Sequence, residues 1–166
     1  MHKAVVALGA NLGDAAATLR AAAAELEAAE GVRIAARSRL YATSPVDSSG
    51  PDYVNAAVLL ETALPPMALL RLCQSIENRH GRVRPAGVVN APRTLDLDVI
   101  AYEGTVQSDP VLTLPHPRAK DRLFVLVPLS DIAPDWPLAD GRSVARAIAD
   151  VRRSHPEQKI RLLAAD

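Results

Sequence analysis

The feature that most constrains the fold is an alternation of strand-like and helix-like segments along the chain. Four runs rich in β-branched and other apolar residues are predicted to be strands, at Lys3–Leu8, Val32–Tyr41, Tyr53–Thr62 and Thr94–Tyr102. Helical spacing predicts a helix over Ala15–Glu30, and a second is expected from Pro65-Pro66 to His80, because proline suits a first helical turn. The order βαββαβ predicts an α+β fold of the ferredoxin-like kind, with helices on one face of an antiparallel sheet.

The segments outside this pattern are expected to be loops and a C-terminal extension. Residues 42–50 are polar around Pro45, and residues 82–93 have no periodicity, so both are predicted to be loops. After the fourth strand come an apolar segment, Leu123–Leu129, and a last helix over Ser143–Arg153. A length of 166 residues fits one core, so we expect a single domain over 1–166.

The composition excludes several classes of protein. Hydrophobic residues make up 49% and charged residues 23% of the chain, which is not the balance of a disordered segment. Basic and acidic side chains number 19 each, so the net charge of +0 argues against a general nucleic-acid binder. The single cysteine, Cys73, excludes a disulfide framework. No apolar run approaches the ~20 residues of a membrane span, and we expect a cytoplasmic monomer without a membrane partner.

The charge is nevertheless uneven along the chain. Between Asn78 and Leu95 there are four arginines and a histidine but no acidic residue: Arg79, His80, Arg82, Arg84 and Arg93. Arginine offers planar paired donors that match phosphate oxygens, so this segment is a candidate clamp for a polyphosphate. Taken alone, such a run is more often a solvated basic loop.

Two acidic residues follow this segment directly. Asp96 and Asp98 are two apart in a strand-like run, so both carboxylates are expected on one face, while Leu95 and Leu97 face the core. Mg²⁺ is held by one or two carboxylates together with water and substrate phosphates. An Asp-x-Asp alone is a weak signal, but next to an arginine-rich loop it indicates a metal-bound nucleoside triphosphate. The sequence contains none of the glycine-rich phosphate-binding motifs, so side chains and metal are expected to bind the phosphates.

Several motifs follow one another over roughly residues 3–140: Gly9-Ala10-Asn11-Leu12-Gly13, Pro51-Asp52-Tyr53-Val54-Asn55, Gly81-Arg82-Val83-Arg84, Pro92-Arg93-Thr94-Leu95-Asp96-Leu97-Asp98 and Pro115-His116-Pro117. In this order they resemble the family of 6-hydroxymethyl-7,8-dihydropterin pyrophosphokinases. The resemblance implies a ferredoxin-like fold and an enzyme of folate biosynthesis. It also implies transfer of pyrophosphate from ATP to the pterin hydroxymethyl group, with release of AMP.

The resemblance also implies roles for individual residues. The catalytic group would be Arg82, Arg93, Asp96 and Asp98, with two Mg²⁺ ions held by Asp96 and Asp98. The ATP site would comprise Gln74, Glu77, Arg84, Val99, Thr113, His116 and Arg122. The pterin pocket would comprise Thr43, Ser44, Val46, Tyr53, Asn55 and Phe124. One of the aspartates or a metal-bound water would take the hydroxyl proton, and the sequence leaves both alternatives open.

The chain departs from the family pattern at a few positions. Asn90 and Ala91 stand where many relatives have an aromatic residue and a glycine, and Pro117 replaces a frequent aromatic residue. We expect loop 82–93 to be mobile when empty and to order over ATP. Two other functions remain open, a nucleotide-sensing module without catalysis and an RNA-binding domain, although the RNA-binding alternative lacks an aromatic pair on the sheet. Cys73 and Trp136 are expected to be packing residues.

Overall fold

The structure is a computed structural model that describes residues 1–44, 52–81 and 95–164. Its strands are β1 (His2–Ala10), β2 (Val32–Arg37), β3 (Leu40–Thr43), β4 (Tyr53–Thr62), β5 (Asp96–Tyr102), β6 (Gln107–Ser108), β7 (Thr113–Leu114) and β8 (Ile160–Ala164). Its helices are α1 (Ala15–Ala28), α2 (Pro66–Arg79), the 3₁₀ turn η1 (Ala119–Asp121), α3 (Leu123–Ile132) and α4 (Val144–Ser154). Among the described residues, no helix combines the length and the apolar character that a membrane crossing requires.

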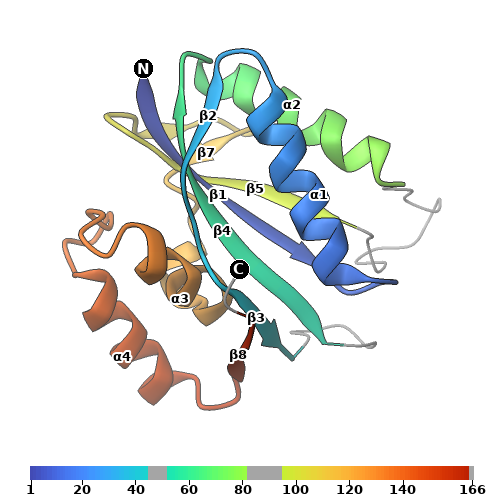
Figure 1. The fold of residues 1–166 in the computed structure, drawn as a ribbon. Helices are drawn as coiled ribbons and strands as arrows, with labels where there is room; N and C mark the ends of the chain where they lie inside the picture. The colour runs from blue at the N-terminus through green and yellow to red at the C-terminus, as the bar shows by residue number, and fades with distance from the viewer. Residues whose placement is uncertain (45–51, 82–94, 165–166) are drawn as a thin grey trace.

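The main sheet is antiparallel, and its strands lie in the order β5-β1-β4-β3-β8, with β2 also pairing with β4 (Figure 1). The central pair β1 and β4 is in register from His2 opposite Thr62 to Ala10 opposite Val54. At the right-hand end of the sheet in Figure 1, the end of β1 lies beside the starts of β4 and β5. This end therefore gathers residues from three strands that are far apart in the sequence.

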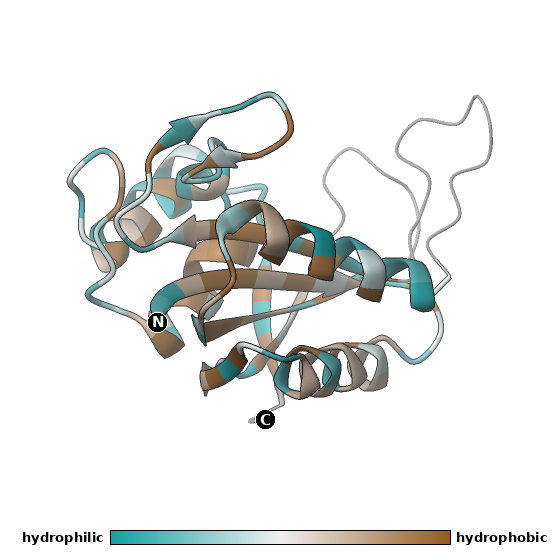
Figure 2. Ribbon diagram, turned by 90° about the horizontal axis from the view of Figure 1, so that it is seen from above, coloured by the Kyte–Doolittle hydropathy of each residue, from teal (hydrophilic) through white to brown (hydrophobic). Residues whose placement is uncertain are grey.

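Helices α1 and α2 cover one face of the sheet. Their buried residues Leu26 and Ile76 pack against Val6 and Leu8 of β1 in one apolar cluster. Fully burying a leucine or isoleucine side chain contributes roughly 1.5–3 kcal/mol each, so this face is a main source of stability. The start of α1 is capped by Asp14, whose side chain accepts a hydrogen bond from the backbone N–H of Ala17 at 3.1 Å. Figure 2 shows the central strands as predominantly apolar.

The other face is covered by the C-terminal extension. Val125 and Leu129 of α3 pack against Val5 and Ala7 of β1, and α4 packs on the far side of α3. The prediction of helices on one face therefore holds for α1 and α2 only. Trp136 lies half-buried against the α3 cluster, which confirms its predicted packing role.

One prediction of secondary structure needs correction, and some elements had not been assigned. The segment Val32–Tyr41 is not one strand, because it is divided into β2 and β3 at Ser38. Ser38 is buried, and its hydroxyl accepts from the N–H of Ala57 at 2.8 Å and donates to the carbonyl of Arg39 at 2.8 Å. The apolar segment from Leu123 is a helix, and β8 was not expected. The predicted loop 82–93 and most of the loop 42–50 lie outside the described residues.

Candidate active site

The two aspartates of β5 lie on the sheet face that α3 covers. Asp96 and Asp98 are half-buried, whereas the intervening Leu97 is only 3% exposed. In the pairing of β5 with β1, Asp96 stands opposite Gly9 and Asp98 opposite Ala7. The expectation that the two carboxylates share one face is confirmed.

The backbone between the aspartates is held from the opposite side by α2. Glu77 is 2% exposed, and its carboxylate accepts a hydrogen bond from the backbone N–H of Leu97 at 2.8 Å. The strand that carries the acidic pair is therefore fixed to α2 at the residue between Asp96 and Asp98.

His116 lies at a junction of charges near this pair. Its backbone N–H donates to the carbonyl of Ile100 in β5 at 2.8 Å, which holds the residue beside the strand. The ring is half-buried, and burial lowers its pKa below the ordinary value; the charges of Arg122 and Arg118 lower it further, and Asp96 raises it. The direction of this shift favours a neutral imidazole, and the charges that act on its pKa are those of two guanidinium groups and of an aspartate of β5.

Arg122 and Phe124 form the neighbouring wall. The Arg122 guanidinium carbon lies 5.3 Å from the centre of the Phe124 ring, within the range of a cation–π contact. Both side chains line a hollow of about 280 Å³, together with Arg118, Asp121, His155 and Gln158. The hollow combines cationic groups with an aromatic face, and this suits an anionic ligand that carries a flat ring.

On the same sheet face, β4 presents an amide side chain. Asn55 is 6% exposed, and its side-chain oxygen accepts a hydrogen bond from the Thr43 hydroxyl at 2.6 Å. Asn55 and Asp96 both stand opposite Gly9, one from β4 and one from β5. Two strand spacings separate them, which is about 10 Å. Asn55 therefore lies on an inner strand of the sheet, since β4 has β1 on one side and β3 on the other.

Gly9 is the residue that makes room for this amide. A Cβ atom added at Gly9 would lie 3.0 Å from the Asn55 side-chain nitrogen, closer than ordinary packing allows. Gly9 belongs to one of the motifs that carry the resemblance, and no role was predicted for it. A glycine inside a strand is a signal of close approach by another group, and this signal was available in the sequence.

The other predicted residues that the structure describes lie on several different elements. Tyr53 is half-buried two residues before Asn55 on β4, Ser44 is half-buried just after β3, and Gln74 is half-buried one turn before Glu77. The Thr113 hydroxyl donates to the carbonyl of Asp109 at 3.1 Å, beside the short strand β7. The Val99 side chain is 3% exposed and packs in the α1–α2 core, and its role in the nucleotide site stays a prediction. Four predicted site residues lie outside the described part of the chain: Val46, Arg82, Arg84 and Arg93.

The donor set of β5 fits a magnesium ion. Within the described residues, no group of three or more His, Cys, Asp and Glu side chains could hold a metal. Mg²⁺ does not need one, because it is bound by one or two carboxylates and completes its shell with water and substrate phosphates. Asp96 and Asp98 supply hard oxygen donors on one face of a rigid strand.

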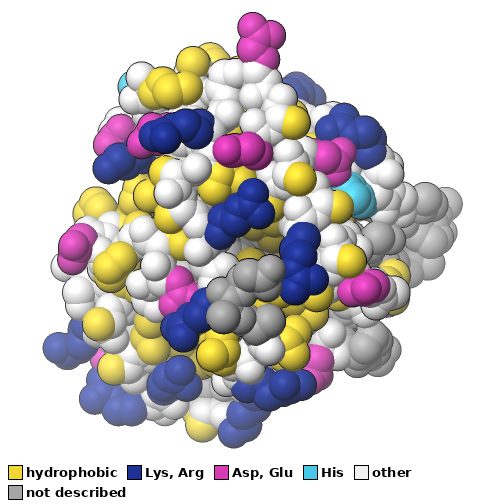
Figure 3. All heavy atoms as spheres, in the orientation of Figure 1, with side chains coloured by type: hydrophobic (Ala, Val, Ile, Leu, Met, Phe, Trp, Pro, Cys, Tyr) yellow, Lys and Arg dark blue, Asp and Glu magenta, His cyan; other side chains and the backbone are white. Residues whose placement is uncertain are grey.

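Figure 3 shows basic and acidic side chains interspersed over the face of the molecule that it draws. On that face, charge of one sign is therefore concentrated only locally.

Comparison with known proteins places these features in a family. A family model described as 7,8-dihydro-6-hydroxymethylpterin-pyrophosphokinase (HPPK) matches residues 5–134. A Methylorubrum extorquens protein named 2-amino-4-hydroxy-6-hydroxymethyldihydropteridine pyrophosphokinase is 45% identical over 159 residues, covering 95% of this chain and 99% of the relative. A protein of the same name from Pseudomonas aeruginosa is 38% identical over 150 residues, covering 90% and 91%.

A solved structure shows the same fold at lower sequence similarity. The crystal structure of an HPPK-DHPS protein in complex with substrates matches 94% of this chain with a TM-score of 0.73 and 13% identity. This chain spans 44% of that protein, so the likeness concerns one part of a longer molecule. The family model covers most of the chain, and two relatives of the same name match it over nearly their whole length. This chain therefore belongs to the 7,8-dihydro-6-hydroxymethylpterin-pyrophosphokinase family.

Proposed function

We propose that the chain transfers the β,γ-pyrophosphate group of ATP to the hydroxymethyl oxygen of 6-hydroxymethyl-7,8-dihydropterin, in folate biosynthesis. The bond between the α- and β-phosphoryl groups breaks, a bond forms from the hydroxymethyl oxygen to the β-phosphorus, and AMP leaves. The observation that carries the proposal is the placement of the acidic pair of β5 and Asn55 of β4 on one sheet face, about 10 Å apart across β1. This separation suits two substrates that must meet end to end.

The acidic pair would hold two Mg²⁺ ions. Bound there, they would supply charge neutralisation to the triphosphate. Asp96 and Asp98 supply the ligands, and the bond from Glu77 to the Leu97 N–H keeps the strand between them in place. The catalytic task of the protein is positioning and charge compensation, because phosphoryl transfer needs little covalent help from side chains.

The residues around His116 would receive the phosphates. Arg122 contributes a permanent positive charge, and the neutral His116 ring can donate one hydrogen bond without adding charge. Arg82 and Arg93, which lie outside the described residues, are proposed to complete this cationic wall, with Arg84 assisting. Gln74 and Thr113 are proposed to contact the nucleotide.

The pterin would lie over β4 and β3. Asn55 carries both a donor and an acceptor, which match the amide-like edge of a pterin ring. The Thr43 bond fixes the orientation of that amide, and Gly9 leaves space beneath it. Phe124 is proposed to stack on the ring from the side of α3, with Tyr53, Ser44 and Val46 completing the pocket.

The broader organisation is proposed on the same basis. We propose a ferredoxin-like arrangement of the strands β1 to β5, acting as one domain over residues 1–166. A monomeric state and a cytoplasmic location stay predictions.

The proposal is tested by following nucleotide products. Purified protein with Mg²⁺ and ATP is expected to form AMP only when hydroxymethyldihydropterin is added, at one AMP per pterin diphosphate. Formation of ADP, or of AMP without the pterin, would contradict the proposed reaction. Binding of ATP with no turnover under any of these conditions would favour the nucleotide-sensing alternative.

A further inference from the structure

Gln158 binds the backbone on both sides of Arg122. Its side-chain oxygen accepts a hydrogen bond from the N–H of Leu123 at 2.9 Å, and its side-chain nitrogen donates to the carbonyl of Asp121 at 2.9 Å. These two groups belong to the two peptide units that flank Arg122. The amide of Gln158 thus binds the backbone on both sides of a single residue, although Gln158 lies 35 positions after Leu123 in the chain.

The residue between these two bonds lies at a change of backbone direction. Arg122 has φ −125° and ψ 115°, an extended conformation between the 3₁₀ turn η1 and helix α3. The side chain of Arg122 makes no capping hydrogen bond to α3, although it occupies the N-cap position. The first N–H groups of a helix need partners from outside the helix, and Gln158 supplies one for Leu123. The conformation of Arg122 therefore depends on a side chain from the C-terminal part of the chain.

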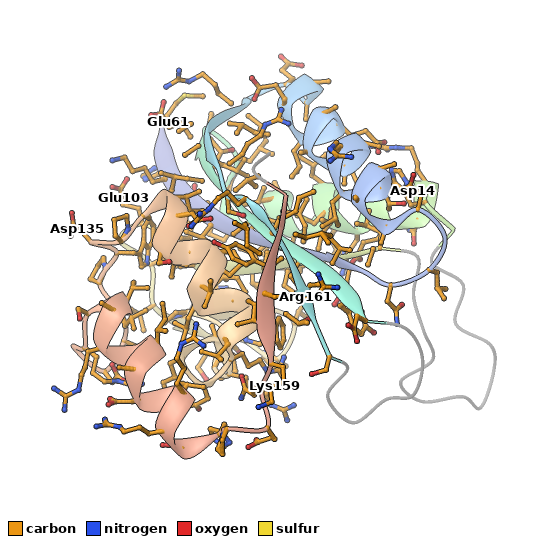
Figure 4. All side chains as sticks on the ribbon, turned by 60° about the horizontal axis from the view of Figure 1, so that its bottom comes forward. Asp14, Glu61, Glu103, Asp135, Lys159 and Arg161 are labelled. Atoms are coloured by element: carbon orange, nitrogen blue, oxygen red, sulfur yellow. The ribbon has the colours of Figure 1, made fainter. Side chains whose placement is uncertain are left out.

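Gln158 is itself held in place. Its N–H donates to the carbonyl of His155 at 3.0 Å, which closes the turn after α4. On one side of this turn, Val151 of α4 packs against Leu126 of α3, and on the other side β8 pairs with β3. Figure 4 shows Lys159 and Arg161 along the path from the end of α4 onto β8. The amide is presented by a segment that is fixed at both ends.

The position of the Arg122 side chain matters because of its neighbours. The guanidinium lies over the Phe124 ring, and both line the hollow that Gln158 also lines. The His116 backbone N–H is bound to Ile100 of β5, and the charge of Arg122 lowers the pKa of the His116 ring while that of Asp96 raises it. A rotation of the backbone at residue 122 would turn this guanidinium away from that ring.

We infer that Gln158 is a positioning residue that aims Arg122 at the phosphates of the nucleotide. The inference rests on the proposed function for the identity of the nucleotide, and it concerns a residue beyond the 5–134 range of the family match. Gln158 acts through Arg122 and not by contact with the reacting atoms. Its loss should therefore weaken the interaction with ATP and leave the interaction with the pterin largely unchanged.

The test replaces Gln158 by methionine, which has a similar length and no hydrogen-bonding amide. With Gln158→Met we expect the KM for ATP to rise about tenfold and the KM for the pterin to change less than about twofold. Affinity for a nonhydrolysable ATP analogue with Mg²⁺, measured by calorimetry, should fall by the same factor. In an Arg122→Ala background, Gln158→Met should cause no further loss, because the two residues act as one unit.

Ser143→Ala is the matched control. The Ser143 side chain accepts a hydrogen bond from the backbone N–H of Arg146 at 3.0 Å. Like Gln158, it therefore gives a partner to an N–H group in the first turn of a helix, in this case α4. Its loss should lower the unfolding temperature to a similar extent and leave the ATP affinity unchanged. If Gln158→Met does not fold, Gln158→Asn takes its place, because a side chain one methylene shorter cannot reach both backbone groups.

Two results would overturn the inference. One is an equal rise of both KM values in Gln158→Met, and the other is an undiminished effect of that substitution in the Arg122→Ala background. Failure of the proposed function is distinguishable, because it appears as a wild-type protein that forms no AMP. The calorimetric comparison of the variants does not require turnover and decides the inference in that case too.

Discussion

The Glu77 carboxylate holds the backbone N–H of Leu97 at 2.8 Å, so a buried helix side chain fixes the residue that separates Asp96 from Asp98. In the described sheet β5 is the end strand and pairs with β1 alone. The N–H groups on its outer edge therefore have no strand partner, and Glu77 provides one from α2. The geometry of the acidic pair depends on this contact.

Glu77→Ala is expected to destabilise the protein and to slow the reaction. An N–H left without its partner in a buried position costs about 1–3 kcal/mol, and β5 would be less firmly held. We expect a corresponding fall in the free energy of unfolding in urea and a fall of about tenfold in AMP formation. Glu77→Gln keeps an acceptor oxygen and should recover most of the stability. If the alanine variant kept full activity, the acidic pair would not depend on this contact.

Asp98→Ala is expected to lower turnover by several orders of magnitude, about a thousandfold or more, because the metal ions would lose a ligand. The side chain is half-buried, so the unfolding temperature should change little. AMP formation at saturating ATP, pterin and Mg²⁺ is the measurement, and Asp135→Ala, which removes an exposed carboxylate, is the control. An active Asp98→Ala enzyme would end the two-metal assignment.

Gly9→Ala is expected to weaken pterin binding. The added methyl group would lie 3.0 Å from the Asn55 side-chain nitrogen, so the amide must move and its bond with Thr43 must lengthen. We expect the KM for the pterin to rise about tenfold, with a smaller change for ATP. In an Asn55→Ala background the methyl group meets no amide, so Gly9→Ala should add no further loss. A full additional loss there would show that Gly9 acts by some other contact.

Asp131 is expected to give the stability a marked dependence on pH. Burial alone would raise the pKa of its carboxyl, but hydrogen bonds from Arg39 and Tyr41 outweigh burial and hold that pKa below its ordinary value of 3.8. A carboxyl with a lowered pKa stabilises the fold fully above the ordinary value, and this contribution is lost as the pH falls through the lowered one. Asp131 joins α3 to β3, since the Tyr41 hydroxyl donates to it at 2.8 Å.

Thermal unfolding of Asp131→Asn across pH follows from this. The variant should unfold at a lower temperature than the wild type at pH 7, and the difference should shrink as the pH falls below about 3.8. Tyr41→Phe, which removes one donor and keeps the carboxylate, should show a smaller loss at neutral pH. A difference between Asp131→Asn and the wild type that is the same at every pH would mean that the charge of Asp131 contributes nothing.

The features that could be predicted from the sequence are those determined by residues close to one another in the chain. The bounds of β4 agree with the predicted Tyr53–Thr62, because a run of Val and Leu between turn residues is a strong strand signal. The common face of Asp96 and Asp98 follows from the two-residue period of a strand. The buried, inert position of Cys73 follows from its place on the apolar side of α2. Each of these needs only a few neighbouring residues.

The parts that were missed depend on contacts distant in sequence. β2 ends just before Ser38, whose hydroxyl accepts a hydrogen bond from the N–H of Ala57. No pattern within residues 32–41 indicates that Ala57 is its partner. Helix α3 is apolar on most sides, because it lies between the sheet and α4, so it lacks the amphipathic period by which helices are recognised. The partner of Glu77 lies 20 residues away, and spacing along α2 cannot reveal it.

The pairing of β8 with β3 has a consequence for how the substrate preference of such an enzyme could change. Because β8 covers its outer side, β3 is an inner strand, and Tyr41 and Thr43 are fastened on both flanks. Thr43 in turn fixes the amide of Asn55. Under the proposed function, substitutions in residues 160–163 of β8 would change pterin recognition through β3, and directed evolution confined to the pocket would overlook them.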